Sequence, residues 1–230
     1  MSNPTQIVRR TTVVVGAVYA LALHTADVQL DTSLKKVLAY LPSAAAFVVA
    51  AFDKWIWAWP GVSRLHARPQ LRGTWRVELR PDPESHIPEG GNQGPIDGYA
   101  VIEQTFWSVS VRQYTAESDS ESRAMTWLTN VDASPVVLNF TYDNVPKREH
   151  RPRSPRHVGA CELRMPRGKP TSVTGTYFTD RFTAGEMTLT LVGRSTDVMT
   201  FEEAEQRHGV AQAISPAHDW LKRLGIGRAE

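Results

Sequence analysis

Two long apolar runs occupy the first 59 residues of the chain. They extend from Thr11 to Val28 and from Val37 to Phe52. A helix needs roughly 20 apolar residues to cross a membrane, so both runs are slightly short. His24 and Asp27 interrupt the first run, and Pro42 interrupts the second. The pattern predicts a membrane hairpin, with helices at about 11–28 and 37–58.

The residues that flank the runs favour this hairpin. Arg9 and Arg10 precede the first run, and Lys54 and Arg64 follow the second. The positive-inside rule then predicts that both ends of the hairpin face the cytoplasm. The stretch "WIWAW" at 55–59 is typical of an aromatic belt at the headgroup level. A pair of buried helices in a soluble bundle, or a secretory signal peptide, would be the alternatives.

Beyond Pro60 the pattern changes to short alternating segments separated by Gly, Pro, Asn and Asp. Eight strands are predicted, at Leu71–Arg80, Tyr99–Phe106, Trp107–Glu117, Ser122–Val131, Val136–Asn144, Val158–Met165, Ser172–Arg181 and Glu186–Arg194. A short helix is predicted at Thr200–Gly209. The expected domains are 1–59 with the two membrane helices, a linker at 60–69, a β-domain at 70–195 and a helical tail at 196–230.

An antiparallel meander of eight strands loses its open edges when it closes into a barrel. Alternation places Trp75, Val77 and Leu79 on one side of the first strand. The triplet "GTW" at 73–75 resembles the Gly-x-Trp that opens the first strand of lipocalin-type barrels. We therefore expect a membrane α-hairpin followed by an all-β, eight-stranded antiparallel, lipocalin-like barrel with a short C-terminal helix. A two-sheet sandwich is the alternative.

Composition and motifs exclude several kinds of functional site. The 230 residues are 41% hydrophobic and 22% charged, with a net charge of +2, which is ordinary for a globular protein. A single Cys excludes an internal disulfide and a thiolate-rich metal site. The sequence contains no HExxH, P-loop, nucleophile elbow or CxxC motif. We expect no enzymatic activity, no catalytic residues, no bound metal and no cofactor.

A basic segment, "KREHRPRSPRH", extends from Lys147 to His157. Its prolines predict an irregular loop, which we call the basic loop. The loop is either solvated, a phosphate-binding lid, or a region attracted to the anionic inner leaflet. Binding of nucleic acid through this loop would depend steeply on the salt concentration. We expect no nucleic-acid partner.

Polar and aromatic side chains are expected to meet at one rim of the barrel. In the hairpin "GTYFTDRFTAGEMTLTL", Tyr177, Thr179 and Arg181 lie on the same side of one strand. Thr183 lies across the turn, and "YDN" at 142–144 ends another strand. Arginine offers a planar fork to phosphates, and tyrosine stacks on bases. The hairpin tip is therefore either part of a small-ligand site or merely solvated.

The whole arrangement resembles the membrane-disrupting effectors of bacterial CBASS anti-phage defence. These effectors combine two transmembrane helices with a β-barrel that receives a cyclic dinucleotide. The stretch "GTYFTDRFTAGEMTL", Gly175–Leu189, is similar to the family's G-x-Y-x-T-x-R-x-T-x-G-x-M-x-L hairpin. "LRGTW" at 71–75 and "FTYDNVP" at 140–146 are also similar, and the resemblance covers residues 10 to 195.

The resemblance implies a mechanism. A cognate nucleotidyltransferase makes a cyclic dinucleotide, the cytoplasmic barrel binds it, and the protein forms homo-oligomers. The helices then disrupt the lipid of the bacterial inner membrane, and the cell dies. The protein would be a multi-pass membrane protein with its N-terminus in the cytoplasm. The identity of the dinucleotide, the oligomer size and the kind of membrane damage stay open.

The resemblance also implies roles for particular residues. Arg181 would meet a phosphate or a base, the aromatic residues would line the site or stack, and the remaining residues would donate hydrogen bonds. The expected ligand-binding residues are Trp75, Tyr142, Asn144, Tyr177, Thr179, Arg181 and Thr183. Two rivals lack a nucleotide ligand. One is a membrane-anchored lipocalin-like carrier with an apolar cavity, and the other is an adaptor protein with a solid barrel.

Overall fold

The computed structural model describes residues 14–19, 21, 32–66, 68–128 and 135–209. Its contacts divide the chain into two units. The N-terminal unit contains residues 1–68 together with residues 104–109, and the barrel unit contains residues 69–103 and 110–230. The loop between the second and third strands therefore belongs by its contacts to the N-terminal unit.

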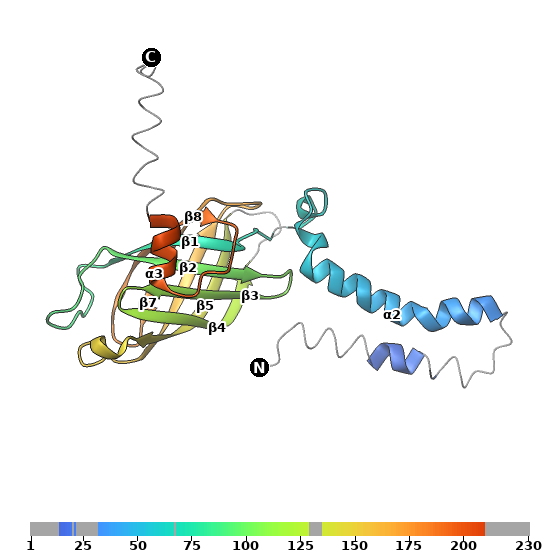
Figure 1. The fold of residues 1–230 in the computed structure, drawn as a ribbon, viewed down its shortest axis with the longest axis horizontal. Coiled ribbons are helices and arrows are strands. Elements are labelled where there is room, and N and C mark those ends of the chain that lie inside the picture. Colours follow the sequence, from blue (N-terminus) through green and yellow to red (C-terminus); the bar gives the residue numbers. More distant parts are fainter. Residues whose placement is uncertain (1–13, 20, 22–31, 67, 129–134, 210–230) are drawn as a thin grey trace, which may run out of the picture. The chain divides into compact units, whose positions relative to one another are not determined.

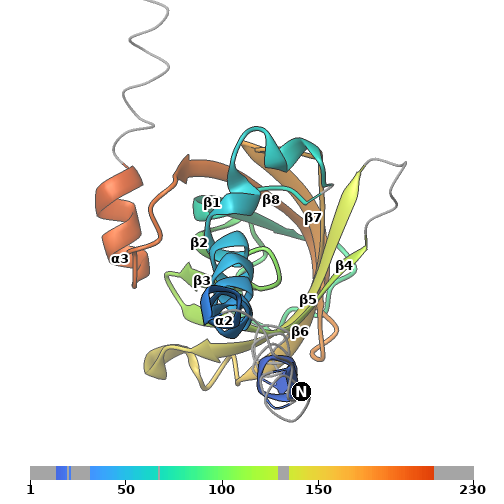
Figure 2. The ribbon, with the colours of Figure 1, turned by 90° about the vertical axis from the view of Figure 1, so that its right-hand side faces the viewer.

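The barrel unit is a closed barrel of eight antiparallel strands, in which each strand pairs with its neighbours in sequence order and the last pairs with the first (Figures 1 and 2). The strands are β1 (Gly73–Pro81), β2 (Ile96–Gln104), β3 (Val109–Thr115), β4 (Ser118–Leu128), β5 (Val136–Pro146), β6 (His157–Met165), β7 (Ser172–Thr179) and β8 (Ala184–Gly193). The predicted eight-stranded meander is confirmed, and the sandwich alternative is wrong.

Apolar side chains fill one half of the barrel. These side chains lie in the half of the barrel that contains the start of β1 and the end of β2. Strands β5, β6 and β8 contribute residues at the same height along the barrel. The fully buried members are Leu71, Trp75, Val77, Ile102, Val136, Leu138, Leu163, Met165 and Leu189. This end of the barrel is a packed core, so an open space can exist only toward the other end.

Gly73 and Trp75 close the packed end. The indole nitrogen of Trp75 donates to the carbonyl of Leu71 at 2.8 Å, which satisfies the buried N–H. Gly73 has a φ of +146°, and a Cβ atom there would collide with the carbonyl of Gly193 on β8. The glycine of the Gly-x-Trp triplet therefore allows β1 and β8 to approach closely.

A short C-terminal helical segment covers the outer face of β2 and β3, as Figure 1 shows. It consists of α3 (Phe201–Ala204) and η4 (Glu205–Gly209). Val198 and Ala204 pack on Tyr99, whose hydroxyl donates to Glu205 at 2.8 Å. The predicted short C-terminal helix is thus confirmed.

The N-terminal unit contains α2 (Thr32–Lys54), η1 (Ile56–Ala58) and η2 (Val62–Arg64). In the described part of the chain, no helix combines the length and the apolar character that a membrane crossing requires. The predicted membrane hairpin is therefore wrong. Helix α2 begins at Thr32, and its apolar part, Val37–Phe52, is shorter than the roughly 20 residues that a span needs. Most of the first predicted span, 11–28, lies outside the described residues.

An aromatic cluster joins the end of α2 to residues 104–109 within this unit. The ring of Phe106 contacts those of Phe52 and Trp107, at centroid distances of 5.0 and 5.4 Å. Asp53 is buried, and its carboxylate accepts the N–H of Trp107 at 3.1 Å. The guanidinium of Arg68 lies over the Phe106 ring, 4.9 Å from its centroid.

Candidate functional site

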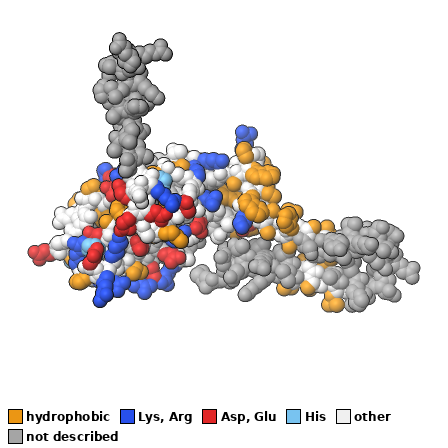
Figure 3. All heavy atoms as spheres, viewed as in Figure 1, with side chains coloured by type: hydrophobic (Ala, Val, Ile, Leu, Met, Phe, Trp, Pro, Cys, Tyr) orange, Lys and Arg blue, Asp and Glu red, His pale blue; other side chains and the backbone are white. Residues whose placement is uncertain are grey.

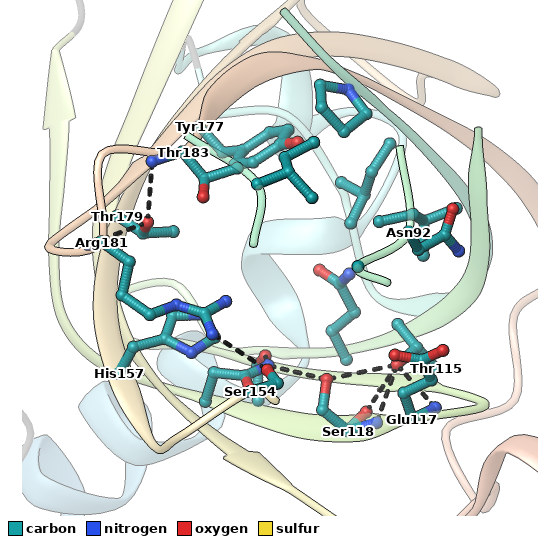
Figure 4. A pocket seen from close by; sticks show the side chains of 18 of the residues that line it. Asn92, Thr115, Glu117, Ser118, Ser154, His157, Tyr177, Thr179, Arg181 and Thr183 are labelled. Carbon is teal, nitrogen blue, oxygen red and sulfur yellow. Dashed lines mark hydrogen bonds between the residues drawn. The ribbon is translucent and has the colours of Figure 1, made fainter. Parts of the chain in front are cut away.

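A cavity of about 350 Å³ lies in the half of the barrel that the apolar core leaves open. All eight strands contribute to its wall. The loops at this end add residues from 87–92, from the β3–β4 turn and from the basic loop. This volume is at the lower end of the range for small-molecule sites. Figure 4 shows Thr179, Arg181 and His157 along one wall and Thr115, Glu117 and Ser118 along another.

Six of the seven predicted site residues line this single cavity. They are Tyr142, Asn144, Tyr177, Thr179, Arg181 and Thr183. Trp75 does not line it, because Trp75 is part of the packed core at the other end of the barrel. The predicted convergence of two distant strand ends at one rim therefore appears in the structure. Whether these residues bind a ligand stays a prediction, and the geometry gives no support to Trp75.

The β7–β8 turn is held by its own side chains. The hydroxyl of Thr179 accepts the N–H groups of Arg181 and Thr183, each at 3.3 Å. Thr183 in turn donates to the carbonyl of His86 at 3.4 Å, which ties the turn to the long β1–β2 loop. Both threonines thus fix the position from which Arg181 extends.

Arg181 is the strongest candidate for binding an anion. One of its terminal nitrogens donates to the hydroxyl of Ser154 at 3.0 Å, and its Nε is buried without a partner among the described residues. Burial lowers the pKa of the guanidinium, with the nearby Asp180 acting in the opposite direction. No described carboxylate forms an ion pair with Arg181. An anionic ligand would supply the missing negative charge.

Asn144 is braced by two serines that the sequence did not single out. Its amide nitrogen donates to Ser118 at 2.9 Å and to Ser120 at 2.8 Å. Because both amide hydrogens are used in this way, the predicted role of Asn144 as a donor to ligand does not fit the geometry. The amide oxygen is buried and accepts no hydrogen bond from the described residues, so it is an unsatisfied acceptor.

Two tyrosines form the aromatic part of the wall. Tyr142 lies opposite Gly159 on β6, where a Cβ atom would overlap its ring. Burial raises the pKa of Tyr142, and burial also raises the pKa of Tyr177 to about 12. Both phenols are therefore neutral at pH 7, and both residues line the cavity.

His157 was not predicted as a site residue. It is 8% exposed and lines the cavity beside Asn144, with which it pairs across β5 and β6. Burial lowers its pKa, and the positive charge of Arg181 lowers it further, so the imidazole is neutral at pH 7. Its Nδ1 donates to the carbonyl of Pro155 at 3.2 Å, which leaves Nε2 as an acceptor.

The basic loop contributes Arg153 and Ser154 to the cavity wall. Arg156 anchors the loop to Asp143 on β5 at 2.5 Å, and Arg153 reaches Glu117 in the β3–β4 turn at 2.6 Å. Of the readings left open for this loop, these contacts favour a lid over the site. The sequence showed that Lys and Arg residues cluster around the prolines of this loop. It did not show which of them lie at the cavity.

The described residues include no cluster of three or more His, Cys, Asp or Glu side chains suited to a metal ion. Cys161 lines the cavity, and burial raises the pKa of its thiol to about 12, so it is not a reactive thiolate. Among the described residues, the cavity wall thus offers one cation without a carboxylate partner, together with neutral aromatic rings and several hydrogen-bonding groups. Such a surface suits a ligand that carries both phosphate and flat heterocycles.

Comparison with known families agrees with this geometry. Residues 66–191 match the sequence model of the family described as "Cap15, cyclic dinucleotide receptor domain". The match covers more than half of the chain, so the chain belongs to the Cap15 cyclic dinucleotide receptor family. No curated protein matches it. The resemblance to the receptor barrels of CBASS effectors is therefore confirmed, and the ligand class is a cyclic dinucleotide.

Proposed function

We propose that the protein is a CBASS effector whose barrel cavity binds one cyclic dinucleotide, with Arg181 in contact with a phosphate. One observation carries this proposal. In a chain of the cyclic dinucleotide receptor family, an arginine that has no carboxylate partner among the described residues lies at the wall of the barrel cavity. Tyr142 and Tyr177 offer ring faces for the bases, and Asn144 offers an acceptor for a base N–H.

The events around binding are also part of the proposal. A cognate nucleotidyltransferase would supply the dinucleotide, and the protein would act as a receptor rather than as an enzyme. Binding would favour a homo-oligomeric state, which requires that the oligomer bind the dinucleotide better than the resting protein does.

The bacterial inner membrane is the proposed place of action, with the barrel on its cytoplasmic side. Exposed apolar side chains of the N-terminal unit support this location, as the orange area in Figure 3 illustrates. Phe47 is 71% exposed and Leu65 is 86% exposed. Exposed apolar groups of this kind are typical of surfaces that meet lipid or another protein. The proposal does not require a membrane-spanning hairpin.

The rival functions are less well supported by the cavity. An apolar carrier requires an apolar wall, whereas this wall contains Arg181, Asn144 and His157. An adaptor with a solid barrel requires a filled interior, whereas about 350 Å³ is open here.

Calorimetric titration of the 230-residue chain with 3′,3′-linked cyclic dinucleotides tests the proposal. We expect one member of the panel to bind with one-to-one stoichiometry. Arg181→Ala should weaken that binding by roughly 10- to 100-fold, because a charge-assisted hydrogen bond is lost. Arg164→Ala is the matched control, since Arg164 pairs with Glu162 and its side chain is 65% exposed. Binding that is equal in the Arg181 and Arg164 variants would remove Arg181 from the site.

A further inference from the structure

We infer that Arg153 is a second phosphate-binding residue, which Glu117 masks in the unliganded protein and releases when the dinucleotide enters. This inference rests on the proposed function, because it concerns the same cavity. It assigns a role to the basic loop that the family match does not contain.

The charged residues of the cavity wall determine which cations are available to bind phosphate groups. The described lining residues include two arginines, Arg153 and Arg181, and two acids, Asp97 and Glu117. Asp97 pairs with Arg76 at 3.2 Å, and Glu117 pairs with Arg153 at 2.6 Å. A cyclic dinucleotide carries two phosphodiester groups, on opposite sides of its ring. Arg181 can meet one of them, and Arg153 is the cation left for the other.

The contacts of Arg153 show how the mask is built. Its guanidinium donates to Glu117 in the β3–β4 turn and to the carbonyl of Gly90 in the β1–β2 loop, at 2.6 and 3.3 Å. It also contacts Nδ1 of His150 within the basic loop at 3.0 Å. The side chains of Arg153 and Glu117 are 38% and 39% exposed, so their pair lies at the rim of the cavity. A pair this exposed is worth at most about a factor of five in an equilibrium constant. A phosphate that offers a two-oxygen contact to the guanidinium can therefore displace the carboxylate.

The backbone at both residues is held independently of this ion pair. The carbonyl of Glu117 accepts the N–H of Lys147 at 2.8 Å. The N–H of Arg153 donates to the carbonyl of His150 at 3.2 Å, and so does the N–H of Ser154 at 2.9 Å. The two side chains can therefore change partners while the loop and the turn keep their shape. Ser154, which binds Arg181, follows Arg153 directly in the chain, so the two arginines flank one point of the wall.

Substitutions with opposite expected effects test this arrangement. The 230-residue chain is titrated with 3′,3′-linked cyclic di-AMP, cyclic di-GMP, cyclic GMP–AMP and cyclic UMP–AMP. For the probe that binds, Arg153→Ala should lower the affinity about tenfold, because one charged contact is lost. Glu117→Gln should raise the affinity about threefold, because it frees Arg153 at little cost in shape. The gain should shrink when Glu117→Gln is combined with Arg153→Ala. Glu162→Gln, on the outer face of β6, is the matched control.

The outcomes separate this inference from the proposed function. A gain of affinity in Glu117→Gln cannot result from misfolding, so a gain that depends on Arg153 supports the mask. If a probe binds the unmodified protein but Glu117→Gln leaves its affinity unchanged or lowers it, the mask is wrong and the proposed function stands. If no probe binds the folded, unmodified protein, the proposed function fails, and the inference fails with it.

Discussion

Gly159 sets the position of Tyr142 in the cavity wall. The two residues lie opposite each other on β6 and β5, and Tyr142 lines the cavity. A Cβ atom at position 159 would overlap the end of the Tyr142 ring, so only glycine leaves room for this ring position. An aromatic ring that covers a cross-strand glycine is thus an integral part of the cavity wall.

Gly159→Ala should therefore push the Tyr142 ring into the cavity. We expect the dinucleotide affinity to fall about tenfold, because the stacking surface moves, a loss in the range of base–aromatic contacts. Titration calorimetry measures the change, and the melting temperature checks the fold. Gly61→Ala is the control, since a Cβ atom there would meet nothing within 4 Å. Unchanged affinity in Gly159→Ala would mean that Tyr142 does not contact the dinucleotide.

At the level of single residues, alternation predicted which side chains face inward but not how deep they lie. Trp75 and Tyr177 both face the interior, and the sequence therefore assigned both to the site. Trp75 lies near the start of β1 and is fully buried in the core, whereas Tyr177 lies near the end of β7 and lines the cavity. Depth depends on strand register around the whole barrel, which a single strand does not reveal.

The C-terminal segment depends on a reciprocal cap at the start of α3. The hydroxyl of Thr200 accepts the N–H of Glu203 at 3.1 Å, and the carboxylate of Glu203 accepts the N–H of Met199 at 2.9 Å. This arrangement satisfies N–H groups that a helix start otherwise leaves unpaired. It also holds Val198 and Ala204 against the outer face of β2 and β3.

Thr200→Ala should destabilise this segment. We expect the free energy of unfolding to fall by about 1 kcal/mol, the usual effect of losing a helix cap. Urea denaturation measures the loss, and Thr200→Ser, which keeps the hydroxyl, should restore most of it. If Thr200→Ser and Thr200→Ala lose stability equally, the hydroxyl makes no contribution and the cap is not what holds α3.

At the level of elements, the strands were predictable and the N-terminal helices were not. Alternation and turn residues located all eight strands within a few positions. The predicted fourth strand began at Ser122, but β4 begins at Ser118, because pairing with β5 extends the ladder through a polar stretch that resembles a turn. In the N-terminal unit, the apolar runs suggested membrane spans, although the helix that forms, Thr32–Lys54, also includes charged residues at both ends of its apolar part. Apolar composition alone did not fix where the helix begins.

For the whole molecule, the β2–β3 loop is the segment of the barrel chain that belongs by its contacts to the N-terminal unit. At one end, β2 and β3 supply Ile96 and Thr115 to the cavity wall. At their other end, the loop between them, residues 104–109, belongs by its contacts to the N-terminal unit. One continuous piece of chain therefore reaches from the cavity to the aromatic cluster around Phe106. Coupling between a receptor and an effector function requires an element whose state both parts influence.

Phe106→Ala should preserve dinucleotide binding but abolish the effect of the protein on cell growth. Phe106 contacts the rings of Phe52 and Trp57, and the guanidinium of Arg68 lies over its face, whereas Phe106 is not a lining residue of the cavity. We expect the variant to bind the dinucleotide with unchanged affinity. If the unmodified protein arrests growth when a nucleotidyltransferase is co-expressed, as the proposed function requires, the variant should not. Phe178→Ala, at a residue that is 60% exposed on β7, should retain both properties. If Phe106→Ala still arrests growth, Phe106 is not needed to couple binding to the effector function. If Phe106→Ala lowers the dinucleotide affinity, the loop instead supports the fold of the site.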